Sequence, residues 1–367
     1  MKHFSFIIIF FLFVPVGLAQ FDFTPKTADS SGYRGGPRLG DSITQVWRAG
    51  IVIQPGPALE DVQLTLPVPM NWFEQKVVSV NEEKTDAETA GKIEYIPVKN
   101  GAVKNGNAGR AGKEIGAEGI TATQMRLNLG DVKAGKSVQI ILAFELKNYA
   151  LLPPEQTDDY VIPKNVPKEY SQFLRESPHI ESDNPVFTKM YRDITKDRKT
   201  AWDKVEGLYS FVQNNVKYDD AGWRLDARGA LAVTRMPKGQ WSGDCKDMSC
   251  LFVALCRAGN VPARIVRVPE HCYAEFYLEL KPDKKDKKQN NKKPQGFWFP
   301  CQVSGAYSFG GIPERRVILQ KGDSFPDPDD SKRKLLWLQE CFEGNIPISG
   351  GPKPKFKWIH EAEAEKK

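Results

Sequence analysis

The segment with the clearest chemical potential is GDCKDMSC, residues 243–250, directly before the apolar run LFVALCRAG. Gly243 and Asp244 favour a sharp turn of the backbone, so Cys245 falls in the first turn of the helix that the apolar run predicts. The unpaired amides of a helix N-terminus carry about half a positive charge, which favours thiolate over thiol and lowers a cysteine pKa. Cys245 is therefore placed to act as a nucleophile.

A thiolate nucleophile needs a proton partner, and histidine is suited to that role. The chain has four histidines. His3 lies in the N-terminal leader, His179 in a connector and His360 in the C-terminal tail, which leaves His271 as the partner of Cys245. Such a pair suits attack on an amide carbonyl, with the imidazole moving the proton. The structural alternative is a small buried cysteine that caps a helix, near a histidine at a strand end.

Two amphipathic helices and three strands are predicted around this pair. Apolar residues recur at three- and four-residue intervals in residues 200–219, and again in the segment that starts at Cys245 and that Gly259 is placed to end as a left-handed cap. VPARIVRV, HCYAEFYLEL and GFWFPCQVSG then follow as strands. Alternation along the middle strand gives two faces, one with His271, Tyr273, Glu275 and Tyr277, the other with Cys272, Ala274, Phe276 and Leu278.

The N-terminal half is predicted to be all-β. Between residues 41 and 149, segments such as VQLTLPVP and SVQIILAFEL alternate apolar and polar residues and are separated by Gly, Pro and Asn. This pattern is typical of an antiparallel sandwich in which one face of each sheet is buried. The Gly/Asn/Lys-rich insert at 99–119 interrupts two strands and is expected to be a mobile loop. This half has no Cys and no His, so it offers few candidates for nucleophilic or metal chemistry.

The N-terminus has the features of an export signal. Lys2 supplies a positive charge, residues 7–14 are apolar, and Gly17 and Ala19 form a small-x-small cleavage site. The apolar run is shorter than the roughly 20 residues of a membrane span. We therefore expect cleavage after Ala19, no transmembrane segment in the mature chain, and a periplasmic or secreted protein. An uncleaved anchor is the alternative.

Composition argues against several other classes of protein. The 367 residues have room for about two domains, and the formal net charge of +6 traces largely to the lysine-rich segment at 281–296. No basic patch is interleaved with aromatic residues, so no nucleic-acid partner is expected. The cysteine spacings match no zinc site, so neither a metal nor a cofactor is expected. The charged residues 353–367 are predicted to be a solvated chain end.

Several motifs resemble the core of the transglutaminase-like superfamily. GDCKD, RAGNVPAR, HCYAEFY and WFPCQ follow one another along the chain and are similar, in the same order, to four motifs of that family. The resemblance implies an α+β core in which the cysteine helix packs on an antiparallel sheet that carries the histidine and a third, orienting residue. The matching positions are Cys245, Asp247, Arg257, Gly259, Pro262, Ala263, Arg264, His271, Glu275, Tyr277 and Trp298.

The resemblance also bears on the organisation of the whole chain. Exported bacterial members of the superfamily often have a β-sandwich in front of this core, in agreement with the strand pattern above. We therefore expect a multidomain chain with a signal peptide at 1–19, a linker at 20–40, an all-β sandwich at 41–152, an α+β papain-like or transglutaminase-like core at 165–345 and a charged tail at 346–367.

The third catalytic position departs from the family. Four residues after Trp298, where the resemblance implies an aspartate, the chain has Gln302, and Tyr273 stands where the family usually has tryptophan. A glutamine carbonyl can accept the imidazole N–H and fix its tautomer, as an amide does in Cys-His-Asn proteases, but it brings no negative charge. The candidate catalytic residues are thus Cys245, His271 and Gln302.

The strand pattern suggests a disulfide. If His271 faces Gln302 across an antiparallel pair of strands, the same register places Cys272 opposite Cys301 on the reverse face. In an oxidising compartment, a disulfide between these two cysteines would brace the catalytic strands. The cysteines further along the predicted helix are expected to be buried free thiols.

Two functions follow as hypotheses. The first is an exported cysteine acyl-transfer enzyme acting on amide bonds, a protease or amidase if water resolves the thioester and a transglutaminase if a lysine amine does. The second is a catalytically silent protein that binds a peptide or a cell-wall polymer, which the uncharged Gln302 favours. A protein or peptide, with cell-wall peptide among the candidates, is the expected partner in either case, while enzymatic activity and oligomeric state stay open. Asp247 and Arg264 are expected to be structural, through the helix dipole and ion pairing.

Overall fold

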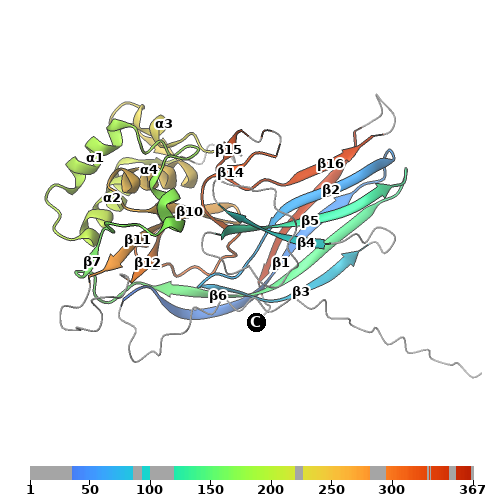
Figure 1. The fold of residues 1–367 in the computed structure, drawn as a ribbon, viewed down its shortest axis with the longest axis horizontal. Coiled ribbons are helices and arrows are strands. Elements are labelled where there is room, and N and C mark those ends of the chain that lie inside the picture. The colour runs from blue at the N-terminus through green and yellow to red at the C-terminus, as the bar shows by residue number, and fades with distance from the viewer. Residues whose placement is uncertain are drawn as a thin grey trace, which may run out of the picture.

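The computed structural model describes residues 35–85, 93–99, 120–219, 226–281, 295–328, 330, 332–346 and 353–364. The predicted signal peptide, nearly all of the insert at 99–119 and most of the lysine-rich segment lie outside the described residues. Long antiparallel strands make up one part of the molecule, and helices packed on a shorter sheet make up the other (Figure 1). The predicted order, a strand-rich region followed by an α+β core, is confirmed.

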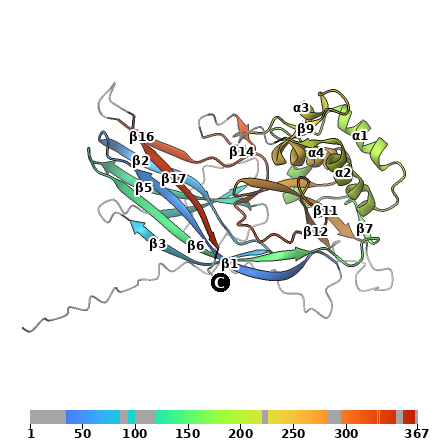
Figure 2. The same ribbon diagram turned by 180° about the vertical axis from the view of Figure 1, so that it is seen from behind.

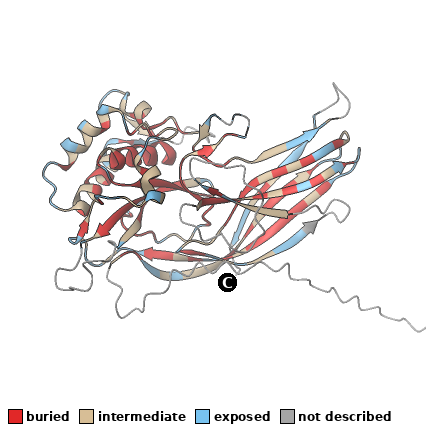
Figure 3. Cartoon of the chain, in the orientation of Figure 1, coloured by how far each residue is buried: buried red, intermediate tan, exposed pale blue. Residues whose placement is uncertain are grey.

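The strand-rich part is a sandwich of two antiparallel sheets. One sheet has the order β17-β1-β6-β3, and β2, β4, β5 and β16 lie in the other. Alternate side chains along these strands are buried, and the buried sets of the two sheets meet in one apolar cluster (Figure 3). The strands of its N-terminal half are β1 (Arg38–Ile53), β2 (Leu59–Val68), β3 (Gln75–Thr85), β4 (Ile93–Lys99), β5 (Ile120–Val132) and β6 (Val138–Leu152).

The second part has helices on one face of a sheet. In Figure 2, α1 to α4 lie together beside β11 and β12 at one end of the molecule, and the sandwich extends toward the other end. Among the described residues, no helix is long and apolar enough to cross a membrane. The remaining elements are β7 (Tyr160–Val161), the 3-10 helix η1 (Lys168–Leu174), α1 (Pro185–Thr195), α2 (Ala201–Asn215), β8 (Lys217–Tyr218), α3 (Ala230–Thr234), β9 (Ser242–Gly243), α4 (Cys245–Ala258), β10 (Ala263–Val268), β11 (His271–Leu280), β12 (Gly296–Cys301), β13 (Gln320–Lys321), β14 (Phe325–Pro326), β15 (Lys334–Leu335), β16 (Cys341–Asn345) and β17 (Phe356–Ala364).

Helix α4 is the central element of the second part. Asp244 caps it by accepting hydrogen bonds from the backbone amides of Lys246 and Asp247 at 2.9 and 3.1 Å. Every residue from Cys245 to Arg257 is buried, because α1, α2 and α3 pack on one side of the helix and β10 and β11 on the other. The helix that begins at the predicted nucleophile is therefore packed between helices on one side and strands on the other.

Gly259 ends α4, but not in the left-handed conformation that the sequence suggested. Its φ is −97°, and the left-handed residue is Asn260, with a φ of 59°. The glycine is required for space instead, since a Cβ at this position would lie 2.1 Å from Tyr191 Cε2.

The two parts of the molecule share one sheet. β13 pairs with β10 on one side and with β5 on the other, so the second sheet of the sandwich continues into β10, β11 and β12. Lys321 in β13 is buried and pairs with Glu74 at 2.5 Å and with Glu275 at 2.6 Å. One buried cation thus joins a carboxylate of the sandwich to a carboxylate of the strand that begins at His271.

The C-terminal segment returns to the sandwich as a strand, so the prediction of a free, solvated end is wrong for residues 356–364, although most of their side chains are exposed. β16 pairs with β2, and β17 pairs with β1. The charged residues of β17, Lys357, Glu361 and Glu363, are exposed, whereas Trp358 packs on the sandwich core and Ile359 is buried. β17 is an edge strand, and an edge strand buries few side chains. Its composition is therefore similar to that of a segment exposed to solvent. The predicted domain bounds stay a prediction, although β16 falls in the range assigned to the core and pairs with the sandwich.

Candidate active site

Cys245, the first residue of α4, is buried and forms part of the wall of a cleft. The thiol and backbone amide of Cys272 and the imidazole of His271, all in β11, act on the pKa of its thiol. The hydrogen bond from the Cys272 thiol is the main influence that lowers the pKa of Cys245. Burial raises the pKa of Cys245, whereas a hydrogen bond to His271 and the charge of its imidazole lower it further. The resulting pKa is about 5. The thiolate therefore prevails at neutral pH.

His271 begins β11 and lies between Cys245 and Gln302. Its Nε2 is 3.3 Å from Gln302 Oε1, so Nδ1 is the ring nitrogen that remains for the thiol. An N–H on Nε2 that donates to the glutamine carbonyl fixes the tautomer in which Nδ1 can exchange a proton with sulfur. The three residues singled out from the sequence thus lie together, and their catalytic role stays a prediction.

The register of β11 and β12 differs from the predicted one by two residues. Cys301 lies opposite Ala274 and not opposite Cys272. Extending the observed register places Gln302 diagonal to His271 on the same face, a separation that a long side chain can span. The predicted pairing of the two cysteines is therefore wrong, and all six cysteines of the chain, each within the described residues, are free thiols.

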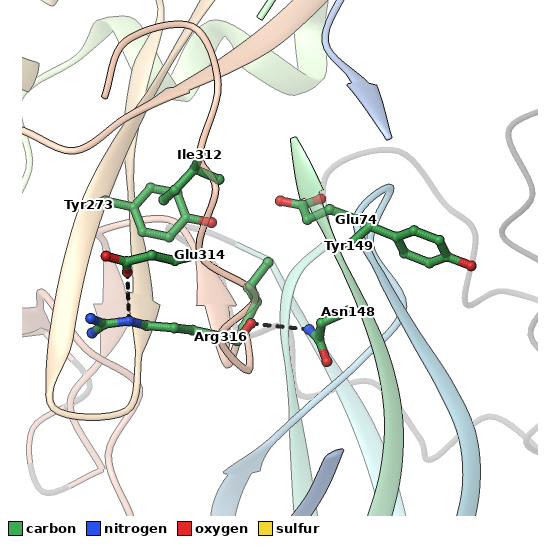
Figure 4. Close-up of a pocket in the computed structure, with 8 residues that line it drawn as sticks. Glu74, Asn148, Tyr149, Tyr273, Ile312, Glu314 and Arg316 are labelled. Atoms are coloured by element: carbon green, nitrogen blue, oxygen red, sulfur yellow. Dashed lines mark hydrogen bonds and ion pairs between the residues drawn. The ribbon is translucent and has the colours of Figure 1, made fainter. Parts of the chain in front are cut away.

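Gln302 has a second partner that no motif in the sequence indicated. Its amide nitrogen donates to Glu314 Oε1 at 3.2 Å, and Glu314 Oε2 pairs with Arg316 Nε at 2.7 Å. In Figure 4 this ion pair lies beside Tyr273, which shares a strand face with His271. The contact with Glu314 orients the amide so that its carbonyl oxygen faces the imidazole.

A cleft of about 460 Å³ opens beside the thiol and the imidazole. His360, assigned from sequence to the solvated tail, lies here with Nε2 3.3 Å from Glu340 Oε1, and burial lowers the pKa of His360. Among the described residues, no group of three or more His, Cys, Asp or Glu side chains is placed to hold a metal ion. The walls come from both parts of the molecule and include Cys245, Arg267, His271, Trp337 and Glu340 from the second part and Trp47 and His360 from β1 and β17.

Two further motif residues, Asp247 and Arg264, are buried and form ion pairs, as expected of them. Asp247, in the first turn of α4, pairs with Arg228 at 2.9 Å and accepts a hydrogen bond from the backbone amide of the same arginine at 2.6 Å. Arg264 pairs with Glu275 at 2.6 Å and lies over the ring of Trp298, 4.0 Å from the centroid. These contacts hold α4, β10 and β11, the elements that carry the thiol and the imidazole.

Comparisons with known proteins define the class of the second part. Residues 188–302 match the family model of the transglutaminase-like superfamily. The crystal structure of a candidate cysteine protease from Cytophaga hutchinsonii has a TM-score of 0.52 at 14% sequence identity, covering 90% of this chain and 93% of that one. The two chains thus share a fold that extends over the sandwich and the core. Residues 188–302, in the second part of the protein, thus form a transglutaminase-like core.

Two other similarities are more limited. An uncharacterized protein of Haemophilus influenzae is 25% identical over 134 residues, which are 35% of this chain and 35% of that protein. The chain therefore matches only about a third of the length of this relative. The periplasmic domain of TgpA from Pseudomonas aeruginosa aligns over 72% of this chain and 88% of its own at 10% identity, with a TM-score of 0.31, which is too low to establish a common fold.

Proposed function

We propose that the protein is an exported cysteine acyl-transfer enzyme that acts on amide bonds of proteins or peptides. The observation that carries the proposal is the placement of Cys245 and His271 together in the wall of an open cleft, with the His271 imidazole in contact with Gln302. Buried cysteines without a proton partner keep their protons, and burial raises the pKa of Cys250 and of Cys256 well above the ordinary value. Cys245 lies on the same helix, and its pKa is about 5.

In the proposed mechanism, the Cys245 thiolate attacks the amide carbonyl carbon and a tetrahedral intermediate forms. The imidazolium of His271 gives its Nδ1 proton to the amine nitrogen, the C–N bond breaks, and a thioester remains on sulfur. The backbone amide of Cys245, at the N-terminus of α4, supplies a donor for the oxyanion. Water or a primary amine, deprotonated by the neutral imidazole, then attacks the thioester and releases the thiolate.

Gln302 and Glu314 together take the place of the aspartate that the family motif has. The glutamine carbonyl holds the imidazole in one tautomer, while the carboxylate lies one side chain further away, 3.2 Å from the amide nitrogen. Orientation is therefore kept, but the negative charge is more distant from the imidazolium and is shared with Arg316. We expect a slower enzyme than one with a carboxylate in direct contact with His271.

The cleft supports a peptide-like partner. Its volume of about 460 Å³ is within the usual range for small-molecule sites, and its walls combine the aromatic rings of Trp47 and Trp337 with the charged groups of Arg267 and Glu340. Such a surface suits a segment that has both apolar and charged groups, with cell-wall peptide among the candidates. Export is inferred from the leader-like N-terminus, which lies outside the described residues.

Acylation with p-nitrophenyl acetate tests the proposal without knowledge of the natural substrate. The acetyl group should appear on Cys245 in the tryptic peptide 239–246 and turn over in the wild type, and it should form much more slowly in His271→Ala. Adding a fluorescent primary amine separates the two reactions, because a transglutaminase transfers the acetyl group to the amine and a hydrolase to water. Absence of both a Cys245 adduct and turnover of the ester, under conditions that acetylate exposed lysines, would contradict the proposal.

A catalytically silent binding protein is the second candidate. Gln302 in place of the family aspartate favours it, because an amide gives the imidazolium no charge to pair with. This alternative predicts that peptides bind in the cleft with the same affinity in the wild type and in Cys245→Ala, and that neither protein turns over the acetyl ester.

A further inference from the structure

A second cysteine lies against the candidate nucleophile. Cys272 follows His271 in β11, and its side chain points to the opposite face of the strand, which α4 covers. Its Sγ is 3.8 Å from Ser249 Oγ. Ser249 is one helical turn after Cys245 and lies on the same face of α4, so the Cys272 thiol faces the side of the helix that carries Cys245, and its interaction with the Cys245 thiol lowers the pKa of Cys245.

We propose that Cys245 and Cys272 form a site of reversible oxidation, in which a hydroperoxide oxidises Cys245 and Cys272 closes a disulfide that switches the nucleophile off. The inference rests on the proposed function in that Cys245 is taken to be the reactive thiolate. It goes beyond that function because it gives Cys272, which no catalytic step uses, the role of a resolving thiol.

The chemistry balances in two steps. The Cys245 thiolate attacks the distal peroxide oxygen, the O–O bond breaks, and the products are a sulfenic acid and an alkoxide or hydroxide that takes a proton from water. The sulfur of Cys272 then attacks the sulfenic sulfur, its proton leaves with the hydroxyl group as water, and an S–S bond forms. Sulfur is oxidised and the peroxide is reduced. A dithiol later restores both thiols by exchange.

Access and acidity assign different roles to the two sulfurs. Cys245 lines the cleft, so a peroxide reaches it from solvent, whereas Cys272 is 1% exposed. Cys245 is largely ionised near neutral pH, while burial raises the pKa of Cys272 well above the ordinary value. Oxidation therefore begins at Cys245, and Cys272 is shielded from direct attack while it lies within reach of the sulfenic acid.

The other cysteines do not compete for this role. Cys250 lies five residues after Cys245 in α4 and faces a different direction, and Cys256 lies eleven residues after Cys245, about three turns or 16 Å further along the helix. Cys301 is opposite Ala274, two positions further along β11. Cys272 is thus the cysteine that is placed to react with an oxidised Cys245.

The sequence makes the disulfide easy to identify. Trypsin cleaves after Lys238 and Lys246 and after Arg267, so Cys245 and Cys272 fall in separate peptides, 239–246 and 268–284, each with no other cysteine. Cys301 falls in a third peptide, 293–315. Purified protein would be treated with a small excess of hydrogen peroxide, its remaining thiols blocked with iodoacetamide, and the unreduced digest examined by mass spectrometry.

We expect 239–246 linked to 268–284 as the main oxidised product in the wild type, with full recovery of Cys245 labelling after dithiothreitol. Cys272→Ser should accumulate sulfinic acid on Cys245 that dithiothreitol does not reverse. Cys301→Ser, a matched change at a buried cysteine of the next strand, should behave as the wild type does.

Two results would overturn the inference. One is that Cys245 of the wild type is oxidised to sulfinic acid as fast as it is in Cys272→Ser, and that the wild type gives no linked peptide. The other is a link between 268–284 and 293–315, which would identify Cys301 as the partner of Cys272. Both readouts are peptide masses and need no substrate, so the disulfide can be established even if acyl transfer is not. The linked peptide of the wild type can be measured even if a variant fails to fold.

Discussion

Gln302 Oε1 lies 3.3 Å from His271 Nε2, and the amide nitrogen of the same side chain donates to Glu314. The amide thus has one favoured orientation, because a flip would bring its NH2 group against the N–H of His271 and its carbonyl against a carboxylate. Glu314 therefore acts on the imidazole through Gln302. We therefore expect Glu314, which the family motifs do not contain, to be a positioning residue.

Removing the hydrogen bond between Glu314 and Gln302 should lower the reactivity of the Cys245 thiol without unfolding the protein. In Glu314→Ala the amide of Gln302 loses its partner, and we expect the neutral-pH alkylation rate of Cys245 to fall about fivefold, the effect of a hydrogen bond worth about 1 kcal/mol. Glu314→Gln keeps an acceptor oxygen and should retain most of the rate. A Glu314→Ala variant that is alkylated as fast as the wild type, at an unchanged unfolding midpoint, would show that Glu314 has no positioning role.

Exchanging the two side chains tests whether charge limits the site. Gln302→Glu alone brings two carboxylates together, so one takes up a proton and little is gained. The double variant Gln302→Glu with Glu314→Gln places a carboxylate directly on His271 and the amide behind it. It should hold the thiolate–imidazolium pair to higher pH and turn over p-nitrophenyl acetate faster than either single variant. Equal rates in the double variant and the wild type would mean that the missing charge is not limiting.

The buried cation between the two parts of the molecule should be important for stability. Lys321→Met leaves Glu74 and Glu275 without their shared partner, and breaking a buried ion pair in this way costs about 3–5 kcal/mol. Lys133→Met, at an exposed position of the sandwich, is the control and should change the free energy of unfolding little. Urea unfolding at neutral pH measures both, and similar values for the two variants would contradict the account.

The stability lost in Lys321→Met should also depend on pH, in a direction that follows from the pKa of Glu275. Burial raises the pKa of Glu275, but Lys321 and Arg264 more than offset burial and lower it below its ordinary value of 4.5. A carboxylate with a lowered folded-state pKa contributes stability that is present above its ordinary pKa and is lost as the pH falls through the folded-state value. The stability difference between the wild type and Lys321→Met should therefore be largest at neutral pH and shrink below about pH 4.5.

The elements that carry the site were predictable because their signals are local. Apolar spacing together with Asp244 and Cys245 specifies the start of α4, and alternation along HCYAEFYLEL specifies which side chains share the face of His271. Both faces of β11 are as predicted, since Cys272 and its alternate neighbours pack under the helix. The two-residue error in the register of β12 left these faces unchanged, because side chains alternate with a period of two.

Contacts between distant segments were not predictable. The lysine-rich segment between β11 and β12 has no short-turn signal that would set their register, so Cys301 was paired with the wrong residue. Glu314 lies in a segment without regular structure, and nothing local marks it as a partner of Gln302. His360 was set aside because it lies in the charged segment 353–367, which was predicted to be a chain end, although the pairing of β17 with β1 brings it into the cleft.

The most direct test of the central claim is the rate at which iodoacetamide alkylates Cys245 between about pH 5 and pH 9, followed by mass spectrometry. Cys341, which is only partly buried, gives an internal reference within the same protein. The account predicts a Cys245 rate that is half maximal near pH 5 and several-fold lower at neutral pH in His271→Ala. A Cys245 that follows Cys341, rises only near the ordinary thiol pKa of about 8.5 and is unaffected by loss of His271 would contradict it.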